Sequence, residues 1–325
     1  MRTALFIFVL ILGLSQFCLH AQVTNFSIFK VTVYNQYSPA PPTTPDVPNA
    51  CYFGAQLNSL DASDYMDVYA NVPGTGSIYF DESASNYFNF NSPYFASKTD
   101  LDTSYPSGEY DFYVDFTNST DSGSLIVPSQ ELYATNAAAF TTNCWLAMQQ
   151  VDPTKCFALR WNSFTPSPGT TTAYTFVDVL DQDSGDTAFA VDFLTPGTTT
   201  TNIPPNTLLY GKTYRVNAFF SNRQDTPNAG FGGALGTVGF DNLTYTTLVT
   251  IPPWLHITLT GDQQVTLTWP SLISNFALQE ENSLSMEDGD WTTLTNVPVM
   301  MGGTNSVTLP VSDGQEFFRL ASFTY

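Results

Sequence analysis

The stretch Tyr110-Asp111-Phe112-Tyr113-Val114-Asp115-Phe116 has a hydrophobic or aromatic residue at every even position and an Asp or Tyr at every odd one. Side chains of a β-strand point alternately to opposite faces, so this period of two predicts a strand with one buried and one solvated face. Antiparallel sheets that pack on one side against a core have this alternation. The stretch therefore predicts an antiparallel sheet with one wet face.

The same alternation recurs in two neighbouring segments. From Tyr65 to Val72, the even positions are Met66, Val68, Ala70 and Val72, and the odd positions are Tyr65, Asp67, Tyr69 and Asn71. Phe88 and Phe90 alternate in the same way with Tyr87, Asn89 and Asn91. No long stretch has helical periodicity, and only Lys98 to Tyr105, before Pro106, predicts a short helix. The fold is therefore expected to be all-β.

Turn residues and prolines divide the 325-residue chain into three strand-rich segments, at residues 22–138, 139–250 and 254–325. The loop from Ser38 to Pro48 is too rich in proline for a strand, and Asp183-Ser184-Gly185-Asp186 predicts a hairpin turn. The prolines of residues 251–253 predict a stiff linker, after which the small third segment is expected to lean on its neighbour. We expect tandem antiparallel β-sandwich modules.

Residues 1–21 have the pattern of a secretory signal peptide. Arg2 supplies the positive charge, Ala4 to Leu14 the hydrophobic run, and Leu19-His20-Ala21 the approach to a cleavage site. The hydrophobic run is short for a membrane span, and no later segment resembles one. The expected location is therefore secreted, extracellular or at the cell surface, without a transmembrane span; an uncleaved N-terminal anchor is the alternative.

The chain is strongly acidic, with 29 acidic and 9 basic residues and a net charge of −20. Cleavage after Ala21 removes Arg2 and leaves eight basic residues against the 29 acidic ones, a net charge of −21. Recognition of a phosphate backbone depends on clustered Lys and Arg, so this charge argues against nucleic acid as a partner. The expected partner is an extracellular glycan or protein.

Cleavage also leaves three cysteines, Cys51, Cys144 and Cys156. Cys144 and Cys156 flank a short polar stretch, residues 149–155, that resembles a connection between two strands. Because secreted proteins fold in an oxidising compartment, we expect a Cys144–Cys156 disulfide, with two buried free thiols as the alternative. No C-x-x-C spacing occurs, so a cysteine metal site is not expected.

Four acidic residues cluster around the predicted hairpin turn: Asp178, Asp181, Asp183 and Asp186. Carboxylate oxygens bind calcium, but Gly185 occupies a place where the calcium-loop pattern has an acid. A plain turn is therefore the main expectation, and a weak calcium site is the alternative. A second acidic group, Glu287-Asp288-Gly289-Asp290, is a lesser calcium candidate. No other cofactor is expected.

No catalytic residue is predicted. A nucleophilic triad needs a base that exchanges protons near neutral pH, and the chain after cleavage has only His256, which follows the diproline. Neither a G-x-S-x-G elbow nor a phosphate-binding loop occurs. A glycoside hydrolase needs only two carboxylates and stays a distant alternative. The protein is therefore expected not to be an enzyme.

The wet faces of the first segment offer a candidate binding surface. Its residues are Tyr65, Asp67, Tyr69, Tyr87, Asn89, Asp111, Tyr113 and Asp115, with Asn71 and Asn91 beside them. Tyrosine rings supply flat, rigid contact area at low entropic cost, and neighbouring Asp and Asn bind hydroxyls. Tyrosine also has a high strand propensity, so a purely structural face is the alternative. Tyrosines clustered on an open sheet would favour glycan binding, and a covering layer would favour the structural face.

Two sets of residues resemble known modules. Leu208, Gly211, Tyr214 and Val216 have the spacing of the tyrosine corner in fibronectin type III sandwiches, and Trp161 matches the core tryptophan of that immunoglobulin-like fold. Four short stretches resemble a C-terminal module of secreted verrucomicrobial bacterial proteins: Leu267-Thr268-Trp269-Pro270, Leu278-Gln279-Glu280, Trp291-Thr292 and Phe317-Phe318-Arg319-Leu320.

The resemblance implies a secreted, non-catalytic, multi-module β-sandwich protein with a structural, adhesive or surface-interaction role. It carries no catalytic residues that transfer to this chain. A carbohydrate-binding protein that uses the Tyr/Asp/Asn face of the first segment is the alternative function.

Overall fold

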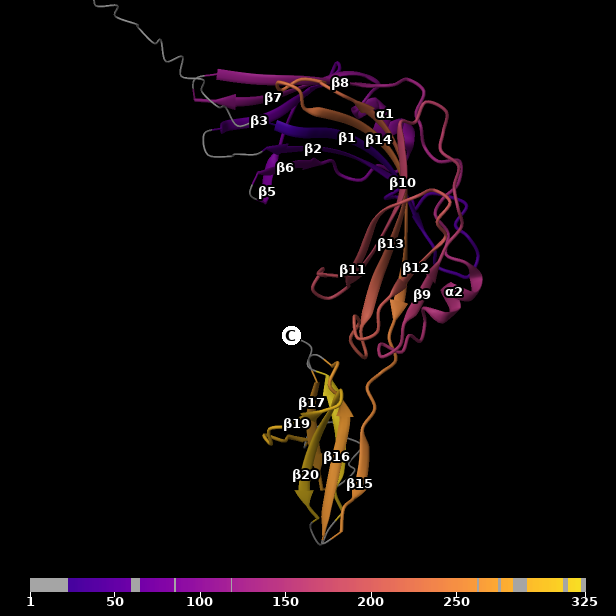
Figure 1. Cartoon of the computed structure of the whole chain (residues 1–325), viewed down its shortest axis with the longest axis vertical. Coiled ribbons are helices and arrows are strands. Elements are labelled where there is room, and N and C mark those ends of the chain that lie inside the picture. Colours follow the sequence, from indigo (N-terminus) through magenta and orange to yellow (C-terminus); the bar gives the residue numbers. More distant parts are fainter. Residues whose placement is uncertain are drawn as a thin grey trace, which may run out of the picture.

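The computed structural model describes residues 23–59, 65–84, 86–117, 119–261, 263–273, 276–282, 291–311 and 315–322. Two expectations, the signal peptide at residues 1–21 and the acidic group at 287–290, lie outside these residues. The described residues consist mostly of antiparallel β-strands, with short helices at two places (Figure 1). The expected all-β fold is confirmed.

The elements of the first third of the chain are β1 (Val23–Asn35), β2 (Cys51–Ser59), β3 (Tyr65–Val72), β4 (Gly76–Tyr79), β5 (Asp81–Ala84), β6 (Tyr87–Asn91), α1 (Lys98–Ser104), β7 (Gly108–Phe116) and β8 (Ser119–Val127). The alternating stretches are strands, as predicted, and the predicted short helix is α1. Ser97 caps this helix by accepting a hydrogen bond from the Asp100 N–H. The proline-rich loop between β1 and β2 is free of strands, as predicted.

The middle of the chain contains α2 (Thr142–Ala147), β9 (Phe157–Arg160), β10 (Thr172–Asp181), β11 (Thr187–Leu194), β12 (Thr200–Ile203), β13 (Thr213–Thr226) and β14 (Leu235–Val249). The C-terminal module contains β15 (His256–Leu259), β16 (Gln264–Pro270), β17 (Phe276–Glu281), β18 (Thr292–Thr293), β19 (Val299–Met301), β20 (Thr304–Pro310) and β21 (Phe317–Ser322).

The first two segments share one sheet. Among the described residues, its strand order is β11-β10-β13-β14-β1-β2-β6-β5, and β1 pairs in parallel with β14 from Asn25 and Leu235 to Asn35 and Tyr245. The expected boundary between residues 138 and 139 therefore does not separate two sheets. Strands β13 and β14, of 14 and 15 residues, are long enough to run through both halves of the sheet. The sequence pattern of each strand taken alone does not reveal this.

The first half is a sandwich. The sheet β4-β3-β7-β8 packs against β1, β2 and β6 of the shared sheet around Phe26, Phe53 and Phe112, which are fully buried. Val238 and Phe240 of β14 lie in the same core, although they come from the second segment. The two halves are therefore joined by packing as well as by the β1–β14 pairing.

The second half has its own core, between the shared sheet and the pair β9–β12. Trp161 is 1% exposed there, and the Tyr214 hydroxyl accepts a hydrogen bond of 2.9 Å from the Leu209 N–H. A tyrosine that ties back to upstream backbone is the tyrosine corner of fibronectin-type sandwiches. The predicted local motif is therefore present, within a sheet that is larger than one such module.

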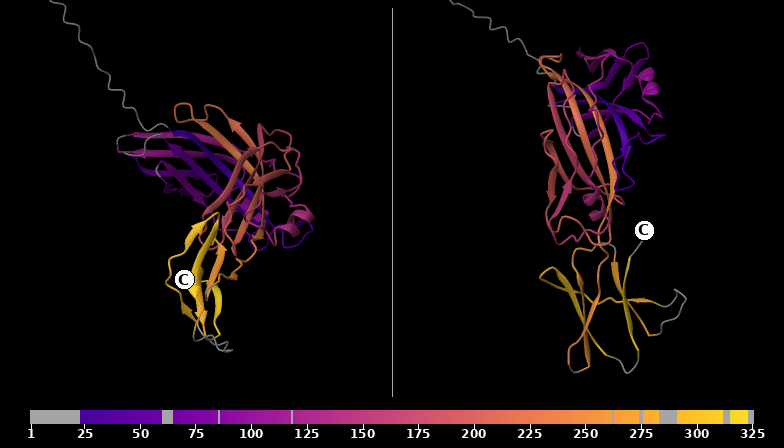
Figure 2. Two further views of the ribbon diagram at one scale, coloured as in Figure 1. Left: turned by 60° about the horizontal axis from the view of Figure 1, so that its bottom comes forward. Right: turned by 90° about the vertical axis from the view of Figure 1, so that its right-hand side faces the viewer.

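The C-terminal module is a small sandwich of the sheets β15-β16-β20-β19 and β18-β17-β21, with Leu267 at its centre. Figure 2 shows it below the main body, joined through residues 250–255. It leans on the second half as expected, since the Tyr210 N–H donates to the Leu272 carbonyl at 2.8 Å and Gly211 lies against Pro253 and Phe276.

The predicted Cys144–Cys156 disulfide is wrong for this structure, because both cysteines are free. Cys144 lies on helix α2 and not on a strand, and its buried sulfur accepts a hydrogen bond from the Arg160 N–H. Cys156 precedes β9 and is exposed. Cys144 was expected to end a strand, but it lies in a helix that Thr141 caps. In the helix its side chain is buried in the core.

Candidate ligand-binding sites

Three tyrosines form a row across the outer face of the sheet β4-β3-β7-β8. Tyr79, Tyr69 and Tyr113 lie directly opposite one another on β4, β3 and β7. The rings of Tyr69 and Tyr113 stack with centroids 5.0 Å apart, and those of Tyr69 and Tyr79 are 5.6 Å apart. Tyr79 is 62% exposed, and no described strand or helix packs over the row. These three residues are called the tyrosine row below.

Polar groups surround the tyrosine row. Asp67 is opposite Asp115, and Asn71 is opposite Asp111, on the two sides of the Tyr69–Tyr113 pair. A polar pocket of about 270 Å³ adjoins Tyr113 and is lined by Asp111, Tyr113, Ser122, Gly123, Ser124, Ala229 and Gly230. Burial and the nearby Asp115 carboxylate raise the pKa of Tyr69, so its hydroxyl stays protonated and able to donate at neutral pH. The row thus combines ring surface with hydroxyl-binding groups.

Three of the predicted face residues lie elsewhere. A β-bulge between Tyr65 and Asp67 adds Met66 to the strand, which shifts the alternation and turns Tyr65 inward, against Phe88, at a ring distance of 4.6 Å. Met66 is exposed as a result. Tyr87 and Asn89 belong to the shared sheet, on the other side of the sandwich.

The structure therefore brings together Asp67, Tyr69, Asp111, Tyr113 and Asp115, and adds Tyr79, which the sequence analysis missed. Tyr79 belongs to a four-residue strand that is too short for alternation to be recognised.

The acidic turn is a hairpin turn between β10 and β11, and a plain turn was the main expectation from the sequence. Two of its carboxylates pair with Lys212, whose ammonium lies 2.8 Å from Asp183 and 3.4 Å from Asp181. Asp178 points elsewhere and accepts a 2.7 Å hydrogen bond from the Asn217 amide. No group of three or more His, Cys, Asp or Glu side chains in the described residues is placed to hold a metal ion. The calcium alternative finds no support in this geometry.

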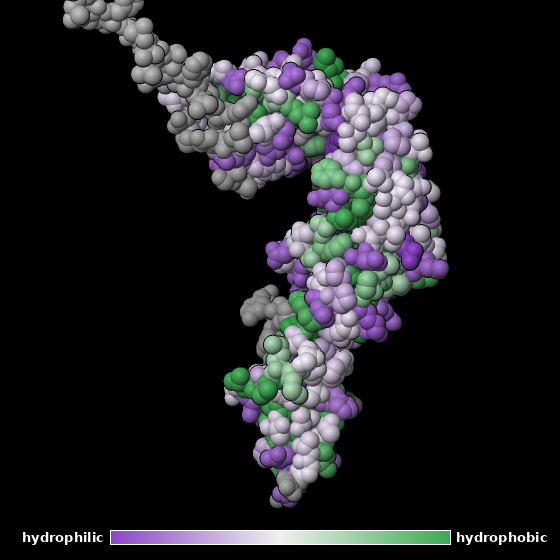
Figure 3. All heavy atoms as spheres, in the orientation of Figure 1, coloured by the Kyte–Doolittle hydropathy of each residue, from purple (hydrophilic) through white to green (hydrophobic). Residues whose placement is uncertain are grey.

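A second site lies where the shared sheet bends. Figure 1 shows β1, β2 and β6 running across the upper body while β10, β11 and β13 run down the molecule, and Figure 3 shows hydrophobic side chains gathered in the hollow between them. A pocket of about 350 Å³ occupies this hollow, called the crook pocket below. Its lining residues are Phe29, Val31, Tyr52, Gly54, Gln56, Asn91, Tyr174, Phe176, Asp192, Phe193, Phe219, Ser221, Arg223 and Asp241.

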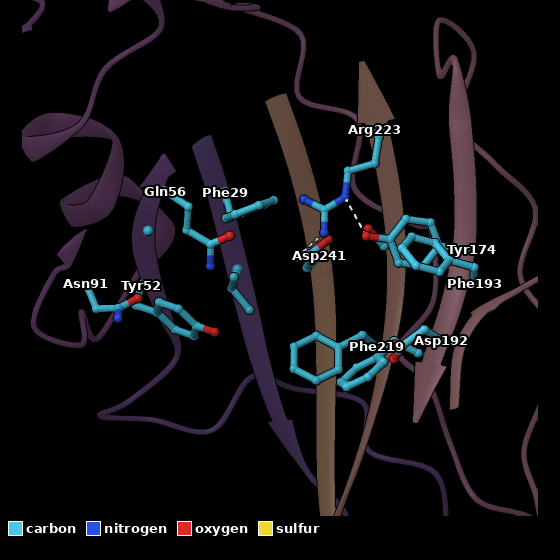
Figure 4. A pocket seen from close by; sticks show the side chains of 14 residues that line it. Phe29, Tyr52, Gln56, Asn91, Tyr174, Asp192, Phe193, Phe219, Arg223 and Asp241 are labelled. Carbon is cyan, nitrogen blue, oxygen red and sulfur yellow. Dashed lines mark hydrogen bonds and ion pairs between the residues drawn. The ribbon is translucent and has the colours of Figure 1, made fainter. Parts of the chain in front are cut away.

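Arg223 is the central charged group of the crook pocket. Its guanidinium lies 4.2 Å from the centroid of Phe29, donates to the Tyr174 hydroxyl at 3.2 Å and pairs with Asp241 at 3.3 Å (Figure 4). Burial raises the pKa of Asp241, and the Arg223 charge opposes that shift. Gly239 makes the arrangement possible, because a Cβ there would be 1.7 Å from Arg223 Nη1.

A β-bulge shapes the rim of the crook pocket. Between Thr175 and Val177, the single residue Phe176 of β10 faces Asp192 and Phe193 of β11. The bulge places two consecutive side chains on the pocket, where regular alternation would place one. Phe193 has φ +54° and is 73% exposed, which is an unusual conformation for a bulky residue and an unusual exposure for a phenyl ring.

Sequence reasoning missed the crook pocket, although one signal was present. Strand β1 is apolar on both faces: Phe26 and Ile28 face the first core, while Phe29, Val31 and Val33 form a separate cluster on the opposite face with Leu243 and Phe219. A strand with two apolar faces indicates burial on both sides. The bend of the sheet that supplies this second burial depends on contacts between distant strands.

Among the described residues, no helix is long and apolar enough to cross a membrane. No protein-family model and no curated protein sequence matches the chain.

Solved structures of tandem modules resemble it weakly. The FN1–FN3 domains of chicken CNTN1 are 8% identical, with 93% of each chain covered and a TM-score of 0.21. A tetra-tandem repeat from the extending region of a large adhesion protein is 12% identical, with 91% of this chain and 74% of that chain covered and a TM-score of 0.28. Similarity at this level does not assign a function.

Proposed function

We propose that the protein is a secreted, non-catalytic adhesive protein that binds extracellular glycans through the tyrosine row. The observation that carries the proposal is the alignment of Tyr79, Tyr69 and Tyr113 across three strands, which no described strand or helix covers and which carboxylates and a polar pocket border. Strands lie about 4.8 Å apart, so the row extends over about 10 Å, enough for successive sugar units to contact it. Asp67, Asp111 and Asp115 are placed to accept hydrogen bonds from sugar hydroxyls.

The chemistry of the row suits binding better than bond cleavage. Asp67 and Asp115 are cross-strand neighbours on an open sheet, whereas a glycosidase holds its acid and its nucleophile around the scissile bond, shielded from water. His256, the one histidine after the expected cleavage, lies on β15 of the C-terminal module, away from both sites.

A structural spacer is the second candidate function. The observation that favours it is the stacking of the Tyr69 and Tyr113 rings on one another, with an angle of 17° between the ring planes. The two ring faces that Tyr69 and Tyr113 turn toward each other are unavailable to a ligand, and cross-strand aromatic pairs also stabilise sheets on their own. Removal of the rings should lower the stability of the sheet if the face is structural, and it should lower the affinity for glycan if the face binds glycan.

The test is binding of the purified chain, residues 22–325, to a polysaccharide and glycan panel, with a double variant Tyr69→Ala, Tyr113→Ala. Glycan binding predicts at least a tenfold loss of affinity with little loss of stability, since truncation of the aromatic anchor residues of a binding surface typically costs about 2 kcal/mol or more of binding free energy. Tyr37→Ala is the matched control, because Tyr37 is 75% exposed and lies outside both sites.

Two results would contradict the glycan proposal. One is binding that is equal in the wild type and the double variant. The other is the absence of binding to every glycan by a chain whose thermal transition shows it to be folded; that result supports the spacer.

A further inference from the structure

We propose that the crook pocket is a second binding site and that it takes a neutral saccharide of one or two rings. This site lies on the shared sheet, on the face away from the first core, and the proposal stands whether or not the tyrosine row binds a glycan. A volume of about 350 Å³ falls at the small end of ligand sites, which span about 300–1,000 Å³.

The polar groups of the pocket call for a ligand with hydroxyls. Gln56 and Asn91 come from β2 and β6, and Asp192 comes from β11, so donors and acceptors face the hollow from both halves of the sheet (Figure 4). Gly54 leaves room for the Asn91 amide, because a Cβ there would be 3.2 Å from its oxygen. A purely apolar ligand would leave these groups without partners.

The charges of the pocket favour a neutral ligand. Arg223 is paired with Asp241, and Asp192 at the rim adds a negative charge to a protein of net charge −20. An anion would be opposed by Asp192 and by that net charge, and Arg223 offers it no free counter-charge because it is already paired with Asp241, so the charges favour a neutral ligand over an anion. Arg223 Nη1 is buried against Gly239 without a hydrogen-bond partner, so ligand hydroxyls would be bound by Gln56, Asn91 and Asp192.

The aromatic rings supply the other half of sugar recognition. Phe29, Tyr52 and Phe219 are partly buried at the floor, and Phe193 stands at the mouth with its ring 4.9 Å from that of Tyr174. A positive φ at a bulky residue is strained, and such strained residues cluster at functional sites. A ligand that lies in the pocket and is covered by the Phe193 ring would account for both the exposure of this ring and its backbone conformation.

The experiment is isothermal titration calorimetry of residues 22–325 with cellobiose, maltose, lactose, mannobiose and chitobiose, with digalacturonate as the anionic arm. The variants are Phe193→Asn, Asn91→Ala and Gln56→Ala, and Tyr37→Ala is the control. Asn tolerates positive φ, so Phe193→Asn removes the ring without forcing a change of backbone. The tyrosine-row double variant Tyr69→Ala, Tyr113→Ala is titrated in parallel.

The expected result is binding of at least one neutral disaccharide, weakened tenfold or more by Phe193→Asn and by Asn91→Ala and unchanged by Tyr37→Ala. Unchanged binding in the tyrosine-row variant would assign the disaccharide to the crook pocket and leave the proposed function to its own test. Binding that survives Phe193→Asn and Asn91→Ala, binding of digalacturonate alone, or no binding of any sugar by the folded chain would overturn the proposal.

Discussion

Asp178 shows how a single buried carboxylate makes stability depend on pH. Burial raises its pKa to about 6, against the opposing effect of its hydrogen bond from Asn217. An unfolded aspartate has a pKa of about 3.9, so the folded chain binds this proton more tightly than the unfolded chain does. The contribution of Asp178 to stability therefore falls as pH rises from about 4 to above 6, and it recovers on acidification.

The variant Asp178→Asn is expected to remove this dependence. Asn keeps an oxygen for the Asn217 amide and carries no charge, so the variant should be about 2 kcal/mol more stable than wild type at pH 7.5 and nearly equal to it at pH 4. Urea unfolding at several pH values measures the difference. A difference that stays constant, or that grows as pH falls, would show that Asp178 is not the group responsible.

At the scale of single elements, the tyrosine corner ties the start of β13 to the preceding loop. The Tyr214 hydroxyl is the acceptor for the Leu209 N–H, and Tyr214 is 2% exposed. Tyr214→Phe would leave that N–H without its partner and should lower stability by about 1–3 kcal/mol. Tyr94→Phe is the control, since Tyr94 is 55% exposed. Equal stability of the two variants in urea unfolding would mean that the corner contributes nothing.

Elements with strong local patterns were predictable from the sequence. The alternation of β3 and β7, the extent and stop of α1, the β10–β11 turn and the spacing of the tyrosine corner each depend on residues close together in the chain. The bulges at Met66 and at Asp192–Phe193 were missed because an extra residue shows only against the strand that pairs with it. One bulge removed Tyr65 from the predicted face, and the other helps to build the crook pocket.

At the scale of the whole molecule, the parallel pairing of β1 with β14 joins the first and second halves. Residue patterns alone predicted separate modules there, because a pairing between residues 210 positions apart leaves no local signal. The same pairing places β2 and β6 beside the bend, so it also produces the crook pocket. The C-terminal module, by contrast, has its own sheets and its own core.

Calorimetry should show this organisation as two transitions. Phe112→Ala in the first core and Phe220→Ala in the second should shift the same transition to lower temperature. Each should reduce the unfolding free energy of that transition by about 3–5 kcal/mol, since both side chains are fully buried. Leu267→Ala should lower a different transition, that of the C-terminal module. If Phe112→Ala and Phe220→Ala act on different transitions, the two halves fold independently and the shared sheet does not couple them.

The claim that the tyrosine row binds glycan is tested most directly by locating the ligand. The measurement is a backbone-amide NMR titration of residues 22–325 with a soluble oligosaccharide of the polysaccharide that the panel selects. Chemical-shift changes are expected to concentrate on β3, β4 and β7 around Tyr69, Tyr79 and Tyr113 and to vanish in Tyr69→Ala, Tyr113→Ala. Shifts confined to other strands, or a spectrum unchanged at saturating oligosaccharide, would contradict the claim.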